Sequence, residues 1–188
     1  MKLLHAEKTD VSRFATPKSR RRQVSTDAAT RASIARLGVE HEPQFSQLLM
    51  SLDRPSRVNR FGHPASDACV QAYAKSAVAT ATFLAGTFVA DTLVGVVEVF
   101  AAGRDGVVEV AFAVHSDWRR RGLCSALMEA AKQWAAQSGV RTLRMVIARN
   151  NWPMRQLAAK AGARLDLDLD EIYADIALTI PTTLAMAA

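Results

Sequence analysis

The residues best suited to chemistry in this 188-residue chain form a cationic loop between a predicted strand, 107–114, and a predicted helix that begins at Gly122. The first backbone N–H groups of a helix have no partner within it and carry the positive end of its dipole, so they can bind a phosphate. Arginines before the glycine add positive charge and forked donors. The predicted anion-binding residues are Arg119, Arg120, Arg121, Gly122, Leu123, Cys124 and Ser125.

The spacing Arg119-x-x-Gly122-x-Cys124 resembles a known cofactor signature. It is similar to the Gln/Arg-x-x-Gly-x-Gly/Ala motif with which the GCN5-related N-acetyltransferase (GNAT) superfamily holds the pyrophosphate of acetyl-CoA. Cys124 departs from that motif, since it stands where the family has Gly or Ala. The resemblance implies acetyl-CoA (CoA) as cosubstrate, no metal, and backbone N–H groups near Val114 as donors to the oxyanion.

A second motif follows at the family's usual distance. Asn151-x-x-Met154-x-x-Leu157-Ala158-x-x-x-Gly162 is similar to the family's Asn-x-x-Met-x-x-Leu-x-x-x-x-Gly-Phe helix, although Ala163 replaces the Phe. Asn151 is expected to cap the helix and to contact the cofactor. The resemblance covers about residues 30–178, and the pattern is closest to the acetyltransferase domain of bacterial protein-lysine acetyltransferases.

Amide formation from a thioester needs an acceptor for the amine proton, and a carboxylate near the reacting carbon can serve. Glu109 lies in an otherwise apolar strand, where burial would raise its pKa. In the protein-lysine acetyltransferases that EVAFAVHSDWRRRGLC resembles, the matching Glu is the general base. The alternative is a charge on the solvated face of the strand. Glu98 is the second catalytic candidate.

The family's usual general acid, a Tyr on the helix after the Asn motif, is replaced by Ala158. Tyr173 could substitute for it or be structural. Direct attack in a ternary complex needs no obligatory acid if the thiolate leaves unassisted or takes a proton through water. The alternative nucleophile is Cys124, because a thiol at a helix N-terminus beside arginines should have a lowered pKa. A small packing residue is the simpler interpretation.

Hydrophobic periodicity indicates the elements that must position these residues. Strands are predicted at 31–37, 80–89, 93–102, 107–114, 141–148, 165–169 and 172–178. Helices are predicted over 45–52, after Ser66, over 122–137 and over 151–162. The predicted fold is α/β (α+β), a mixed, mostly antiparallel sheet of about six or seven strands with about four helices on both faces, which is the GNAT fold.

Two local expectations concern the neighbourhood of the site. A four-residue turn after 93–102 would pair Glu98 with Ala111 and Phe100 with Glu109, placing both carboxylates on one face. The stretch SLDRPSRVNRF at 51–61 resembles a segment of protein-lysine acetyltransferase domains whose helices wall the acceptor site. A plain helix-capping segment is the alternative.

The net charge of +6 is concentrated at the start of the chain, where residues 1–32 hold eight basic side chains against three acidic ones. We interpret 1–29 as a basic, partly disordered arm, 30–180 as a single GNAT domain and 181–188 as a tail. The two cysteines indicate neither a disulfide framework nor a zinc site. No membrane span or signal peptide is evident, so we expect a cytoplasmic protein without a membrane partner.

The sequence therefore predicts an acetyl-CoA-dependent N-acetyltransferase that acts on a primary amine of a protein lysine or a small molecule. One alternative is a CoA-binding regulatory domain without turnover. Another is a nucleic-acid-associated protein led by the basic arm, but no aromatic residue interleaves with its basic cluster, so we expect no nucleic-acid partner. A monomer and a homodimer are both compatible with the sequence.

Overall fold

The computed structural model describes residues 32–103 and 106–179. The predicted basic arm (1–29) and tail (181–188) lie outside these residues. Within the described part, no helix is long and apolar enough to cross a membrane.

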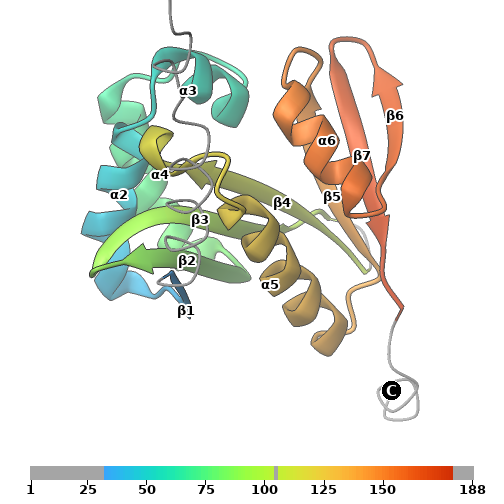
Figure 1. Ribbon diagram of the computed structural model, residues 1–188, viewed down its shortest axis with the longest axis horizontal. Coiled ribbons are helices and arrows are strands. Elements are labelled where there is room, and N and C mark those ends of the chain that lie inside the picture. The colour runs from blue at the N-terminus through green and yellow to red at the C-terminus, as the bar shows by residue number, and fades with distance from the viewer. Residues whose placement is uncertain (1–31, 104–105, 180–188) are drawn as a thin grey trace, which may run out of the picture.

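One mixed sheet organises the described residues (Figure 1). Its strands, in spatial order, are β1 (Ser33–Arg36), β2 (Phe83–Val89), β3 (Thr92–Ala101), β4 (Val107–Val114), β5 (Thr142–Ala148), β7 (Glu171–Ala177) and β6 (Arg164–Asp168). Every neighbouring pair is antiparallel except β4 and β5, which are parallel. This confirms the predicted mixed, mostly antiparallel sheet.

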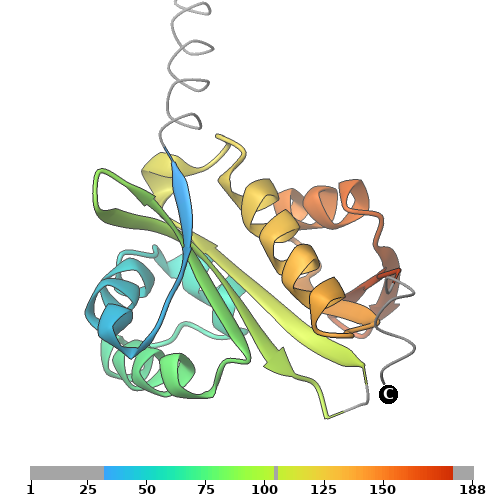
Figure 2. The same cartoon turned by 90° about the horizontal axis from the view of Figure 1, so that it is seen from below.

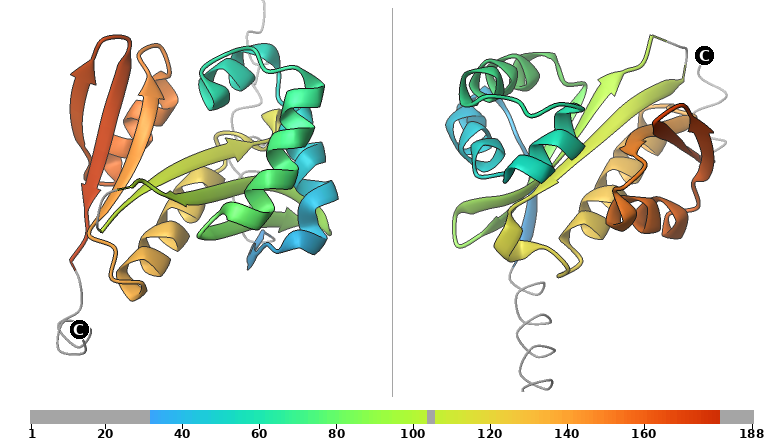
Figure 3. Two further views of the ribbon diagram at one scale, coloured as in Figure 1. Left: turned by 180° about the vertical axis from the view of Figure 1, so that it is seen from behind. Right: turned by 90° about the horizontal axis from the view of Figure 1, so that it is seen from above.

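Helices cover both faces of the sheet, as Figures 2 and 3 show. One face packs against α2 (Glu42–Met50) and α4 (Asp67–Thr80), and the other packs against α5 (Leu123–Gln137) and α6 (Trp152–Lys160). The fifth α-helix of the described residues, α3 (Arg54–Phe61), is one more than the sequence predicted. Asp53 caps it by accepting a hydrogen bond from the Ser56 amide.

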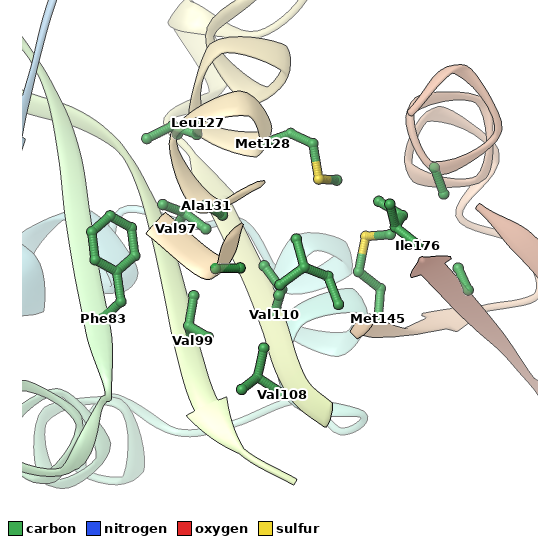
Figure 4. Packing of buried hydrophobic residues seen from close by; sticks show 14 of the residues in the cluster. Phe83, Val97, Val99, Val108, Val110, Leu127, Met128, Ala131, Met145 and Ile176 are labelled. Atoms are coloured by element: carbon green, nitrogen blue, oxygen red, sulfur yellow. The ribbon is translucent and has the colours of Figure 1, made fainter. Parts of the chain in front are cut away.

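The core beneath α5 is formed by alternating side chains of the central strands (Figure 4). Val97, Val99, Val108 and Val110 point toward Leu127 and the other buried residues of this helix. Because side chains alternate along a strand, Glu98 and Glu109 point to the opposite face. The observed register pairs Glu98 with Ala111 and Phe100 with Glu109, so the predicted register is confirmed, while residues 104–105 of the predicted turn lie outside the described residues.

The parallel pair β4–β5 is short. It runs only from Val107–Thr142 to Glu109–Arg144, after which the two strands separate. The rest of β4 therefore has a strand neighbour on one side only. This separation opens the molecule at the end of β4, directly before the cationic loop.

Candidate active site

A cavity of about 570 Å³ lies where β4 and β5 separate. Val110–Val114 of β4 and Met145–Ile147 of β5 line its sides. Ser56, Asn59 and Arg60 of α3 line another wall, and α6 contributes a further one. The start of α5 and the loop before it complete the lining, so the cavity joins the predicted anion-binding loop to α3.

The loop that opens α5 is shaped to leave backbone groups accessible. Gly122 is the N-cap residue and makes no side-chain capping bond. Its φ is 84°, and a side chain added there would meet no atom within 4 Å. Arg120 also has a left-handed backbone, with φ of 62°. The first-turn N–H groups of Leu123–Ser125 thus have no capping side chain, and these three residues line the cavity.

Most of the predicted cofactor residues line this cavity. They are Val114, Arg119, Arg120, Gly122, Leu123, Cys124, Ser125 and Asn151. Arg121 does not line it, and its guanidinium carbon instead lies 4.7 Å from the ring centroid of Trp118. Asn151 caps α6 by accepting a hydrogen bond of 3.3 Å from the Met154 amide. The capping role of Asn151 is therefore confirmed, and its position leaves it beside the cavity.

The side chain of Arg119 is directed to α3. Its Nε donates to the Val114 carbonyl at 3.1 Å, and its Nη2 donates to Ser56 Oγ at 2.9 Å. Its Nη1 also lies 3.8 Å from Asp53 Oδ2. The sequence predicted phosphate contact for this arginine, but its side chain links the end of β4 to the start of α3.

Glu98 is fully buried and bonded through both carboxylate oxygens. Arg60 Nη2 lies 2.6 Å from Oε1, and the Tyr73 hydroxyl donates to Oε2 at 2.6 Å. Burial lowers the pKa of Arg60, but the charge of Glu98 and the hydrogen bonds outweigh it and raise the pKa overall. Glu98 does not line the cavity. We therefore give it a structural role, in place of the catalytic one considered from sequence.

Glu109 occupies the last pair before β4 and β5 separate, opposite Arg144. Its side chain is exposed, so the burial expected from its apolar strand is wrong. The apolar neighbours Val108 and Val110 point into the core beneath α5, whereas Glu109 lies on the other face. Glu109 does not line the cavity itself but directly precedes Val110, which does.

Cys124 is half-buried in the first turn of α5. Burial raises its pKa to about 12, whereas the sequence predicted a lowered pKa from the helix terminus and the arginines. The expectation was wrong because desolvation penalises the thiolate. A protonated thiol at neutral pH is a poor nucleophile, so Cys124 fits the role of a packing residue.

The charges around the cavity are of one sign. Its charged lining residues within the described ranges are Arg60, Arg119, Arg120 and Lys160, and no carboxylate joins them. Arg60 is already paired with Glu98. An anionic ligand is therefore favoured at the end formed by the loop and α6.

Sequence reasoning missed Arg60 and Tyr73 as partners of Glu98. A signal was present, since a carboxylate within the apolar strand VVEVF requires a cation or donor when the strand is buried. Which residue supplies that partner depends on how α3 and α4 pack, and this cannot be derived from spacing along the chain.

Comparisons with known proteins agree with this geometry. Residues 47–163 match the sequence model of the acetyltransferase (GNAT) family. A comparison with curated proteins finds no match. Among solved structures, the GNAT domain of S. lividans PAT gives a TM-score of 0.69 at 19% identity and covers 78% of this chain and 90% of that chain.

Several of the similar structures contain a cofactor. The PaiA N-acetyltransferase of Thermoplasma acidophilum, in complex with coenzyme A, gives a TM-score of 0.62 at 13% identity, with coverage of 78% of this chain and 98% of that chain. The yncA protein of Salmonella typhimurium, with acetyl-CoA, gives 0.63 at 11% identity, with coverage of 79% and 94%. At these identities the likeness establishes the fold.

Proposed function

Because the chain belongs to the acetyltransferase (GNAT) family, as the match over residues 47–163 shows, we propose that it transfers an acetyl group from acetyl-CoA to a primary amine. The observation that carries this proposal is the cavity between β4 and β5, which joins an uncapped helix N-terminus to the α3 wall. One end suits an anionic cofactor, and the other leaves room for an acceptor. No metal is required.

The start of α5 is the proposed site for the pyrophosphate of acetyl-CoA. The amides of Leu123–Ser125 would donate to phosphate oxygens, and Gly122 allows their close approach. Arg120 and Arg121 would add positive charge, although Arg121 must leave its stack on Trp118 to do so. Asn151, fixed by its capping bond, would present its amide group to the cofactor.

The proposed reaction is direct attack in a ternary complex. The amine nitrogen forms a bond to the thioester carbon and the C–S bond breaks, so that CoA leaves as a thiolate. Through water, the thiolate takes the proton that the nitrogen loses on becoming an amide. Glu109 accepts the proton that the ammonium form of the acceptor must lose. Backbone N–H groups near Val114 would stabilise the oxyanion, because this end of β4 has lost its partner β5.

The acceptor is a protein lysine or a small-molecule amine. Its proposed path lies beside α3 and leads toward Val110, the cavity residue that directly follows the exposed Glu109. The fold likeness to the S. lividans domain is compatible with a lysine acceptor but does not select it.

The test measures acetyl-CoA-dependent thiol release against polyamines, amino acids, aminoglycosides and lysine-containing proteins, with mass spectrometry of the products. We expect turnover with at least one amine and a product heavier by one acetyl group. CoA binding without turnover on any acceptor would favour the regulatory alternative. Failure to bind CoA at all would contradict both hypotheses.

A further inference from the structure

Helix α3 is attached to the molecule mainly through polar contacts. None of its eight residues is fully buried, and its apolar contact with the core is limited to the partly buried Phe61, whose ring packs against Tyr73. Arg57 instead donates to the carbonyls of Met50, Leu52 and Ala65 and pairs with Asp67. The position of this cavity wall therefore depends on a few hydrogen bonds and ion pairs, and the loss of either partner would weaken the attachment of α3.

The two ends of α3 are held differently. At the C-terminal end, Arg60 pairs with Glu98, and these side chains are 10% and 0% exposed. At the N-terminal end, Arg119 reaches Ser56 and Asp53, and the Arg119 and Asp53 side chains are 38% and 54% exposed. Solvated ion pairs stabilise little, whereas breaking a buried pair is costly. The contacts that Arg119 makes at the N-terminal end are therefore weaker than the Arg60–Glu98 pair.

The hydrogen bond to Ser56, at the N-terminal end of α3, is donated by Arg119 of the proposed cofactor loop. Arg119 immediately precedes Arg120, whose backbone is left-handed, and lies three residues before Gly122. A ligand bound to the loop amides would fix this backbone. Since Nε and Nη2 of Arg119 bond to Val114 and Ser56 at once, a fixed loop presents the guanidinium to α3 in one orientation.

We propose that Arg119 is a positioning residue that couples the cofactor loop to α3, so that CoA binding orders the wall of the acceptor site. This inference rests on the proposed function, because it concerns the same cavity. It predicts that the acceptor binds more tightly after CoA, and that the acceptor in turn tightens CoA binding by the same factor. Coupling of this kind commonly amounts to about 5-fold or more.

Hydrogen exchange with CoA as the probe tests the coupling. In the parent protein, CoA should slow exchange both in the first turn of α5 and in peptides covering Arg54–Phe61. In Ser56→Ala, CoA should still slow exchange in α5 but should no longer slow it in α3. Arg119→Lys should give the same result, because one ammonium group cannot make both bonds that two guanidinium nitrogens make. The matched control is Ser116→Ala, a hydroxyl of the same loop that bonds only to Asp117 among the described contacts.

Kinetics with the best amine of the panel supply a second measurement. Ser56→Ala should raise the acceptor KM about 5-fold at saturating acetyl-CoA and leave kcat near that of the parent. Asp53→Asn, which keeps a capping oxygen but removes the charge, should give a smaller rise in the same direction. Fold integrity is checked by thermal unfolding of each variant.

The outcomes separate this inference from the proposed function. Absence of a CoA response at α5 would contradict the proposed function. A response at α5 with none at α3 in the parent would overturn the coupling alone. Faster α3 exchange with CoA would also overturn it, because Arg119 would then have left Ser56 for the phosphate. A retained α3 response in Ser56→Ala would exclude the hydroxyl bond as the link.

Discussion

Glu98 and Glu109 point to the same face of the sheet from neighbouring strands, yet Glu98 is fully buried and Glu109 is exposed. The register places them in adjacent same-face pairs, Glu98 with Ala111 and Glu109 with Phe100. Glu98 lies beneath α3 and α4, where Arg60 and Tyr73 bond to it. Glu109 lies where β4 leaves β5. Glu98 is thus fixed in the fold, whereas Glu109 is exposed and its charge interacts with that of Arg144.

The Glu98→Gln variant tests the fixed carboxylate. The change leaves the buried guanidinium of Arg60 without its counter-charge, and breaking a buried ion pair in this way costs about 3–5 kcal/mol of unfolding free energy. Denaturant unfolding measures the loss. Glu129→Gln is the matched control, since it breaks only the exposed pair with Lys132 and should cost less than about 1 kcal/mol. Equal effects of the two changes would contradict the structural role of Glu98.

Tyr73 gives that buried cluster an alkaline pH dependence. Burial, followed by the charge of Glu98, raises the pKa of Tyr73 above its ordinary value of 10.0. Below that value both the folded and unfolded chains hold the proton. Above it the unfolded chain loses the proton and the folded chain keeps it, so stability falls as the pH rises. Tyr73→Phe should flatten this decline, measured by denaturant unfolding across the alkaline range, whereas Tyr173→Phe should retain it because Tyr73 is unchanged.

Gly122→Glu tests the anion-binding loop. The change forces a side chain into a left-handed backbone and puts a negative charge where phosphate must approach the amides, so CoA binding should be lost. Calorimetric titration with CoA measures this. Gly139→Glu is the matched control at the other end of α5, with φ of 72° and equally open space. It carries similar strain and should bind CoA normally. Unchanged affinity in a folded Gly122→Glu variant would remove this loop from the cofactor site.

Much of the fold could be predicted because its signals are local. Alternation indicated the strands, Ser66 and Asn151 marked helix starts, and both side chains do accept capping bonds. The turn length between β3 and β4 was enough to fix the register of Glu98 and Glu109. The anion-binding loop was found because its glycine and arginines are adjacent in the chain.

The chemistry of individual side chains was harder to predict, because it depends on what packs over them. The register that placed Glu98 and Glu109 on one face could not show that α3 and α4 bury only Glu98. Arg119 donates a hydrogen bond to Ser56, which lies 63 residues earlier in the sequence, and no local pattern encodes such a contact. The predicted lowering of the Cys124 pKa took account of the helix N-terminus but omitted desolvation of the thiolate. Each error concerns a tertiary contact.

Cys124→Ala distinguishes direct transfer from an acyl-enzyme. Because burial raises the pKa of Cys124 to about 12, we expect no acyl adduct and near-parent turnover in the variant. Intact mass of the parent after incubation with acetyl-CoA checks for an adduct, and Cys69→Ala controls for the exposed thiol. Loss of turnover with intact CoA binding, together with an acetyl adduct on Cys124, would replace direct transfer by a covalent mechanism.

Glu109→Gln tests the proposed base. The amide keeps the size of the side chain and most of its hydrogen bonding but cannot accept the amine proton, so kcat should fall about 10²–10⁴-fold, the usual contribution of a positioned base. The affinity for acetyl-CoA should change little, since Glu109 does not line the cavity with the loop residues. The variant should recover part of its rate at high pH, where the acceptor amine is already neutral.

The control for Glu109→Gln is Glu171→Gln, another exposed carboxylate on a strand of the same sheet, which should keep parent turnover. Near-parent turnover of Glu109→Gln, with a product proven by mass spectrometry, would remove Glu109 as the base. Glu98→Gln would then be the next variant, assayed where it remains folded. Because both oxygens of Glu98 bond to Arg60 and Tyr73, the structure predicts that any loss of activity there follows its loss of stability.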